Sequence, residues 1–224
     1  MTEFLYQTDS YMKSFTARVT AVDTENHALQ LNQTAFYPGG GGQLPDAGIL
    51  HVNEEVLSLK RARMIKGEHW HFLKEEATLP GVGKEVQGEV DWERRYEIMR
   101  THTAMHILCG VIFRDYGALV TGGDMDILKA RMDFEFESMS KELVLVIEEA
   151  INKEVQAAHE VRVAILPREE AFKIPDLIRT KINLLPEHIQ RVRTVEIVGL
   201  DLQADGGTHV HNTREVGKIN IVDY

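Results

Sequence analysis

The hydrophobic pattern changes its period near residue 90, and this change limits the folds that the chain can adopt. Before it, segments such as SFTARVTAVD (14–23) and EVLSLKRARMI (55–65) alternate apolar and polar side chains, as strands with one buried face do. After it, WERRYEIMRTHTAMHILCGVIF (92–113) carries apolar residues at helical spacing. Asp91 is a suitable N-cap for this helix, and Glu93 favours its first turn. The sequence therefore predicts an α+β fold with a β-only first part.

Two domains follow from this change. Residues 1–90 contain many short alternating segments with Gly-rich punctuation, which indicates a small barrel or a sandwich. Residues 91–224 mix both periods. A long helix is expected after Ser140, and strands are expected over 161–166, 191–199 and 217–224. We expect the domain boundary to fall at residues 90/91.

Composition indicates a soluble, cytoplasmic protein. The chain has 224 residues, of which 43% are hydrophobic and 27% are charged, as is usual for globular proteins. Its first fifteen residues lack the pattern of a signal peptide, and no segment reaches the about 18 consecutive apolar residues of a membrane span. The single cysteine, Cys109, excludes an internal disulfide and a CxxC zinc knuckle.

The net charge of −10 argues against a broadly basic nucleic-acid-binding protein. Local basic groups are present in KRARMIK (60–66) and at Arg94, Arg95 and Arg100. Each group fits a solvated surface as well as it fits a contact with phosphates.

His102 and His106 form the clearest candidate for a metal site. They lie four residues apart on the predicted helix, which places their Cβ atoms roughly 5–6 Å apart on one face. Two imidazoles on this largely apolar face are costly unless they are hydrogen-bonded or bind a metal. A metalloprotease HExxH motif is excluded, because Thr103 stands where that motif needs Glu. The pair alone fits ordinary histidines equally well.

His209 supplies a third candidate ligand, in the stretch LDLQADGGTHVHNT (200–213). A Gly-rich turn precedes it and can bring it close to a helix face. Asp205 has three interpretations: an oxygen ligand, an Asx turn, or an acceptor that orients a histidine. Cys109 lies seven residues from His102, roughly 10 Å along the helix, and is expected to be an inert thiol. His211 is expected to be a surface or loop residue.

A second unusual stretch is TAFYPGGGGQLPDAG (34–48), with four consecutive glycines. Such a run suits a backbone that needs positive φ or that approaches a ligand closely. Thr34, Tyr37 and Gln43 flank the glycines, and polar residues on both sides of a bend suit recognition of a small polar group. The alternative is a loose hairpin loop.

Together, the three motifs resemble the AlaX family, free-standing relatives of the alanyl-tRNA synthetase editing domain. The resemblance covers nearly the whole chain. The glycine-rich stretch (34–48) is similar to the family's N-terminal motif, 90–108 to its HxxxH helix, and 201–219 to its second metal motif. The length matches the medium-sized type. The resemblance implies a small β-barrel-like domain followed by an α+β editing domain with a sheet covered by helices.

The resemblance also implies one Zn²⁺ per chain, held by His102, His106 and His209. The second metal motif of the family usually begins with Cys, and Asp205 stands at that position here. Either Asp205 ligates through oxygen, or the zinc has three protein ligands and a water. An oxygen ligand should lower the affinity for a thiophilic ion.

The implied activity is hydrolysis of mischarged tRNA(Ala), chiefly Ser-tRNA(Ala) and also Gly-tRNA(Ala). A small apolar pocket cannot strongly reject an added hydroxyl, so a second site must select for it. Thr34 is the candidate for contacting the serine hydroxyl, with Gln43 lining the pocket; the alternative for Thr34 is an ordinary strand residue. Arg94, Arg95 and the 60–66 segment are candidates for contacts with tRNA phosphates.

No Ser–His–Asp arrangement is evident in the sequence, so we expect water to attack the ester without an acyl-enzyme. The zinc either activates that water or holds the substrate's amino group. Three other functions stay open: a threonyl-type editing domain, a non-catalytic zinc-stabilised RNA-binding module, and a metal-dependent hydrolase of a small ester. The FYPGGGGQ motif tells against the threonyl type.

Overall fold

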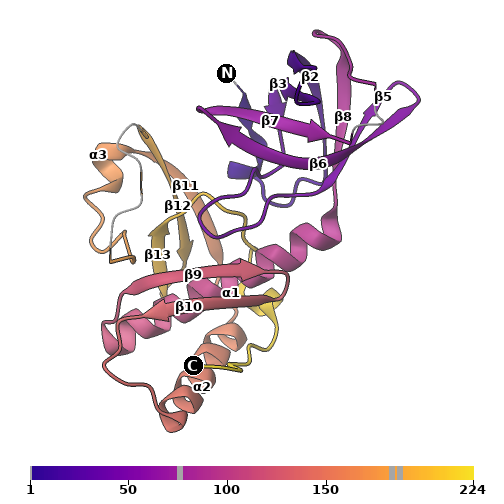
Figure 1. The fold of residues 1–224 in the computed structure, drawn as a ribbon. Coiled ribbons are helices and arrows are strands. Elements are labelled where there is room, and N and C mark those ends of the chain that lie inside the picture. The colour runs from indigo at the N-terminus through magenta and orange to yellow at the C-terminus, as the bar shows by residue number, and fades with distance from the viewer. Residues whose placement is uncertain (1, 75–77, 182–184, 186–188) are drawn as a thin grey trace. The chain divides into compact units, whose positions relative to one another are not determined.

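The computed structural model describes residues 2–74, 78–181, 185 and 189–224. The chain divides into two compact units, Met1–Glu97 and Ile98–Tyr224, and the division lies inside the long helix α1 (Trp92–Tyr116) (Figure 1). Among the described residues, none of the helices combines the length and the apolar character needed to cross a membrane.

Unit 1 is built around a closed barrel of six strands in which all neighbours pair antiparallel (Figure 1). This is the barrel of the two alternatives, barrel or sandwich, that the sequence left open. In barrel order the strands are β2 (Ser14–Asp23), β3 (Ala28–Leu31), β7 (Glu68–Leu73), β6 (Glu55–Ile65), β5 (Gly48–Val52) and β8 (Glu85–Val90). A short parallel pair, β1 (Glu3–Phe4) with β4 (Gln33–Thr34), and the 3-10 helix η1 (Leu5–Gln7) complete the unit.

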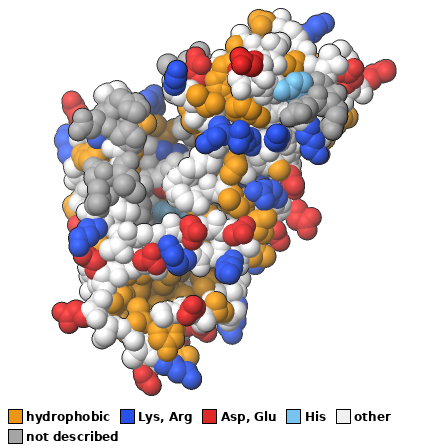
Figure 2. Space-filling view, in the orientation of Figure 1, with side chains coloured by type: hydrophobic (Ala, Val, Ile, Leu, Met, Phe, Trp, Pro, Cys, Tyr) orange, Lys and Arg blue, Asp and Glu red, His pale blue; other side chains and the backbone are white. Residues whose placement is uncertain are grey.

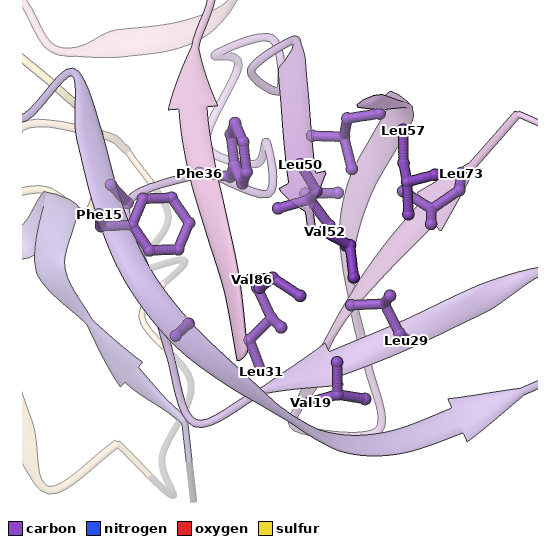
Figure 3. Close-up of a cluster of buried hydrophobic side chains, with 14 of the residues drawn as sticks. Phe15, Val19, Leu29, Leu31, Phe36, Leu50, Val52, Leu57, Leu73 and Val86 are labelled. Atoms are coloured by element: carbon purple, nitrogen blue, oxygen red, sulfur yellow. The ribbon is translucent and has the colours of Figure 1, made fainter. Parts of the chain in front are cut away.

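Alternation of buried and exposed residues produces the barrel core. In β2, Phe15, Ala17 and Val19 are buried, and the residues between them are exposed. Figure 3 shows apolar side chains meeting inside the barrel, among them Phe15 of β2 and Phe36 from the segment after β4. Gly88 makes room for the Phe15 ring, which an added Cβ would overlap.

Unit 2 is the α+β part. It contains the antiparallel ribbon β9 (Val120–Asp126) and β10 (Lys129–Phe134), and the antiparallel sheet β11–β12–β13 (Figure 1). The sheet strands are Val161–Pro167, Arg191–Ile197 and Asp201–Ala204. The remaining elements are α2 (Lys141–Ala157), α3 (Arg168–Ala171) and the 3-10 helix η2 (Thr213–Val216).

The predicted helix starts are confirmed by their caps. The Asp91 carboxylate accepts the backbone N–H of Arg94 at 3.2 Å, and the Ser140 hydroxyl accepts that of Leu143, also at 3.2 Å. At its other end, α2 is followed by Ala158 in the left-handed region, with φ 57°.

The strand predicted over 217–224 is wrong. This tail pairs with no described strand, and side chains of α2 satisfy part of its backbone instead. Asn152 bonds both the N–H and the C=O of Ile219, and the Glu148 carboxylate accepts the N–H of Ile221. Strands β9 and β13 were not predicted. The glycine pair in β9 hides its alternation, and β13 lies in a stretch interpreted as a loop.

Candidate metal centre

The four candidate ligands lie together in unit 2. His102 and His106 are on α1, and Asp205 and His209 belong to the segment after β13. One ligand atom from each residue lies within 4.8 Å of the others. The histidines are buried, and the Asp205 side chain is 14% exposed. Their binding of a metal stays a prediction, and the four residues lie close enough together for it.

The second motif reaches the helix through a tight turn. Asp205 Oδ2 accepts the backbone N–H of Gly207 at 2.6 Å, which is the Asx turn considered from the sequence. Beyond this turn, the backbone N–H of Val210 donates to Thr103 Oγ1 at 3.3 Å. Thr103 thus joins the segment to α1 between the two helical histidines.

Each histidine has a neighbour that orients its ring. His209 Nδ1 lies 3.1 Å from Thr103 Oγ1, and His106 Nδ1 lies 3.2 Å from Asp201 Oδ2. His102 hydrogen-bonds the backbone of Thr208, and its Nε2 lies 3.4 Å from Asp205 Oδ1. Holding one ring nitrogen leaves the other for a shared ion, as is usual for metal-binding histidines.

Asp201 is a site residue that the sequence analysis missed. Its carboxylate is fully buried and also contacts Arg179 Nε (3.3 Å) and Gln203 Nε2 (2.6 Å). Gly110 lets it approach α1, because an added Cβ there would lie 2.9 Å from the Asp201 Cβ. The spacing from Asp205 could have pointed to Asp201, because residues 201, 203 and 205 share one face of an extended segment.

The electrostatics favour a cation. Burial lowers the pKa of His102 to about 4, helped by His106 and Arg193, and burial also places the pKa of His209 well below its usual range. Burial alone would raise the pKa of Asp205, but His102, His209 and His106 outweigh it and hold that pKa well below the ordinary value. Burial alone would lower the pKa of His106, but its contact with Asp201 and the charge of Asp205 outweigh burial and raise that pKa. His102 and His209 are therefore favoured in the neutral form that a metal ligand needs, whereas His106 holds its proton more strongly and would release it on binding an ion.

The chain is similar to proteins of tRNA aminoacylation and editing. Residues 5–94 match the family model for class II (A) tRNA synthetases, and residues 192–224 match the threonyl and alanyl tRNA synthetase second additional domain. The alanyl-tRNA editing protein AlaX-M of Saccharolobus solfataricus is 43% identical over 98% of this chain and 91% of its own length. The chain belongs to the AlaX family.

Two further relatives define the relationship. AlaX-M of Methanosarcina mazei is 36% identical over 99% of this AlaX chain and 90% of its own length. An alanine–tRNA ligase of Pyrobaculum neutrophilum is 37% identical over 98% of this chain, which corresponds to 25% of the ligase. Nearly the whole AlaX chain is therefore similar to one quarter of a much larger ligase.

Two other candidates of this AlaX chain lie outside the cluster. Cys109 is buried, and burial raises the pKa of its thiol to about 12, which agrees with the expected inert thiol. His211 is exposed and is followed at once by the cap of η2, as expected for a loop residue.

The glycine-rich stretch belongs to unit 1. All four glycines, Gly39 to Gly42, have positive φ (58–127°), which explains why side chains are absent there. Thr34 is fully buried in the same unit. Its hydroxyl lies 2.9 Å from His71 Nε2 and accepts the N–H of Phe36 at 3.1 Å. Gln43 is also buried. Contacts of Thr34 and Gln43 with substrate stay predictions.

The two arginines expected to contact tRNA differ. Arg95 is fully buried, and all three of its guanidinium nitrogens donate inside unit 1, to Asp46, the Ser10 carbonyl and the Ala35 carbonyl. It is a structural residue that ties α1 to the glycine-rich stretch, so the predicted phosphate contact is wrong for Arg95. Arg94 is half-buried and donates to the Pro45 carbonyl at 3.3 Å, and its tRNA contact stays a prediction.

Proposed function

We propose that this protein is a trans-editing deacylase that hydrolyses mischarged tRNA(Ala), chiefly Ser-tRNA(Ala) and also Gly-tRNA(Ala). Family membership and the names of the relatives support the tRNA(Ala) substrate. The substrate class implies that the protein works in the cytoplasm. The single observation that carries the proposal is the buried cluster of three oriented histidines and one carboxylate.

The donor set fits one Zn²⁺, which takes imidazole nitrogen and carboxylate oxygen in four-coordinate sites. His102, His106 and His209 would hold it. We propose Asp205 as the fourth ligand through Oδ1, because its Oδ2 already accepts the N–H of Gly207. When bound, the ion would supply Lewis acidity beside the ester of the substrate.

Other residues of the chain orient the metal-binding histidines and disfavour attack on the ester by a protein side chain. Thr103 contacts the ring of His209, and Asp201 lies beside that of His106, so both rings have a neighbour that orients them. The hydroxyl and thiol nearest the ligands on α1 are poor nucleophiles. The Thr103 hydroxyl bonds two groups of the second motif, and the Cys109 thiol is buried with a pKa of about 12. These features support direct attack by water.

Deacylation assays test the proposal. Purified Ser-tRNA(Ala), Ala-tRNA(Ala) and Ser-tRNA(Thr) are incubated with the protein, and its metal content is measured on the same sample. We expect loss of serine from tRNA(Ala) with alanine retained. His102→Ala and His209→Ala should lose both metal and activity, whereas the matched control His211→Ala, in the same motif but outside the cluster, should keep both.

Each alternative function has its own outcome. Preferential cleavage of Ser-tRNA(Thr) would assign the protein to the threonyl type. Bound zinc without any hydrolysis would favour a non-catalytic RNA-binding module. Cleavage of free seryl esters without tRNA would indicate a small-ester hydrolase. Full activity in a metal-free variant would exclude a metal-dependent mechanism.

A further inference from the structure

A basic stripe lies on the outer face of the barrel. Lys60, Arg61 and Arg63 of β6 are all exposed. The pairing of β6 with β7 shifts register between Leu59 and Arg61, so a β-bulge places two successive cations outside the barrel. Figure 2 shows a row of Lys and Arg side chains over this part of the barrel, next to hydrophobic side chains. Without the bulge, strict alternation would direct one of the two cations inward.

Aromatic side chains lie beside these cations on β7. Phe72 is the cross-strand partner of Arg61, and Trp70 is that of Arg63. Both aromatic residues are half-buried and alternate with the buried His69 and His71, so they occupy the outer face. The Arg61 guanidinium lies 5.0 Å from the centre of the Phe72 ring, a cation–π contact that holds it in place.

A cavity opens at the same place. Its volume is about 280 Å³, and its lining includes Asn26, His27, Lys60, Arg61 and Phe72; among the described residues that line it, Glu25 is the acidic one. His27 Nε2 is buried and has no hydrogen-bond partner among the residues that the structure describes. The volume lies just below the roughly 300–1,000 Å³ of small-molecule sites, so it suits a phosphate with part of its ribose.

We propose that this β6–β7 face binds the sugar–phosphate backbone of the tRNA substrate. Lys60, Arg61 and Arg63 pair with phosphates, and the cavity receives one nucleotide's phosphate and ribose. The inference rests on the proposed function for the identity of the RNA. Charge complementarity carries it: the segment 60–66 holds four cations and no acid, in a chain whose net charge is −10. A polyanion approaching such a chain is attracted only by local basic surfaces.

The test compares two double variants that remove the same charge. Lys60→Gln/Arg61→Gln neutralises the stripe. Arg18→Gln/Lys84→Gln neutralises exposed cations on β2 and just before β8, two or more strands away from β6 around the barrel. Binding of uncharged tRNA(Ala) is measured by fluorescence anisotropy over a salt series. For the first variant we expect about tenfold weaker binding and a salt slope smaller by about 2. The control should change less than twofold.

Uncharged tRNA separates this proposal from the proposed function, because its binding is measured without hydrolysis. With Ser-tRNA(Ala), the stripe variant should lose efficiency through KM rather than kcat. If both double variants weaken tRNA binding equally, the proposal is overturned. That result would show that the total charge of the protein attracts tRNA and that the β6–β7 face has no special role. Unchanged tRNA binding in the stripe variant would also overturn the proposal. The same holds if the variant weakens binding of polyglutamate but leaves binding of tRNA unchanged. The Trp fluorescence midpoint of urea unfolding confirms that each variant is folded.

Discussion

The Thr103 hydroxyl oxygen lies 3.1 Å from Nδ1 of His209, across 106 residues of sequence. The same oxygen accepts the N–H of Val210, so Thr103 contacts both His209 and the residue that follows it. Thr103→Val keeps the shape of the side chain but removes the hydroxyl that contacts Nδ1 of His209. We expect zinc affinity to fall about 10–100-fold, as for other residues that orient metal-binding histidines. Competition with a chromophoric chelator measures it.

The matched control is Thr103→Ser, which keeps the hydroxyl and should keep most of the affinity. An unchanged affinity in Thr103→Val would show that His209 is held by its own turn alone.

Asp205 tests the nature of the fourth ligand. Asp205→Asn preserves an acceptor for the N–H of Gly207 but removes the charge beside three histidines. We expect this variant to bind zinc at least tenfold more weakly, because the carboxylate compensates the charge of the ion. Asp205→Cys should instead raise the preference for Zn²⁺ over Mn²⁺, since thiolate is the softer donor. Isothermal titration with both ions checks the two expectations. Unaltered affinity in Asp205→Asn would reduce Asp205 to a turn residue.

Thr34 is best examined through both stability and selectivity. Its hydroxyl donates to His71 Nε2, because His71 Nδ1 faces the carbonyl of Leu29. Thr34→Val leaves His71 and the N–H of Phe36 without this partner, which should cost about 1–3 kcal/mol of unfolding free energy. Urea unfolding measures this cost. If Thr34 also contacts the serine hydroxyl, the ratio of Ser-tRNA(Ala) to Ala-tRNA(Ala) hydrolysis should collapse. If Thr34→Val still discriminates between the two substrates, Thr34 has only a structural role in the barrel domain.

The sequence was informative where a local pattern determines the structure. Alternation located β2 and β6 at their observed bounds, and the i, i+4 spacing located His102 and His106 on one buried face. The resemblance then connected them with His209. Contacts between segments that are distant in the chain could not be predicted from the sequence. Asp201 reaches His106 only because Gly110 lets β13 approach α1.

The burial of Arg95 was also hidden, because an arginine in the first turn of a helix usually lies in water. Its place depends on Asp46, which lies 49 residues away and accepts from it inside unit 1. The tail at 217–224 was misread for a similar reason. Its apolar alternation is real, but the groups that satisfy its backbone are side chains of α2, which no local pattern reveals.

The Arg95–Asp46 pair should be a large contributor to the stability of unit 1. Arg95→Ala leaves a buried, ionised Asp46 without its partner, and we expect a loss of about 3–5 kcal/mol. The double variant Arg95→Met/Asp46→Asn should recover part of this loss, because it removes the uncompensated charge. Guanidinium unfolding measures both. A loss below about 1 kcal/mol in Arg95→Ala would contradict the buried pairing.

The barrel should lose stability in acid because of His69. Burial lowers the pKa of His69 to about 4, from 6.5, although its bond to the Phe36 carbonyl opposes the shift. Between these two values the unfolded chain binds more protons than the folded one, so stability is complete above pH 6.5 and falls as the pH drops towards 4. The loss from His69 is about 3 kcal/mol.

His69→Gln keeps a donor for the Phe36 carbonyl but cannot titrate, so the unfolding free energy of this variant should fall less over this pH range. Both tryptophans, Trp70 and Trp92, lie in unit 1, so their fluorescence follows its urea unfolding at each pH. The control His51→Gln, at a more exposed barrel position, should match the wild type; an equal effect of both substitutions would contradict the assignment.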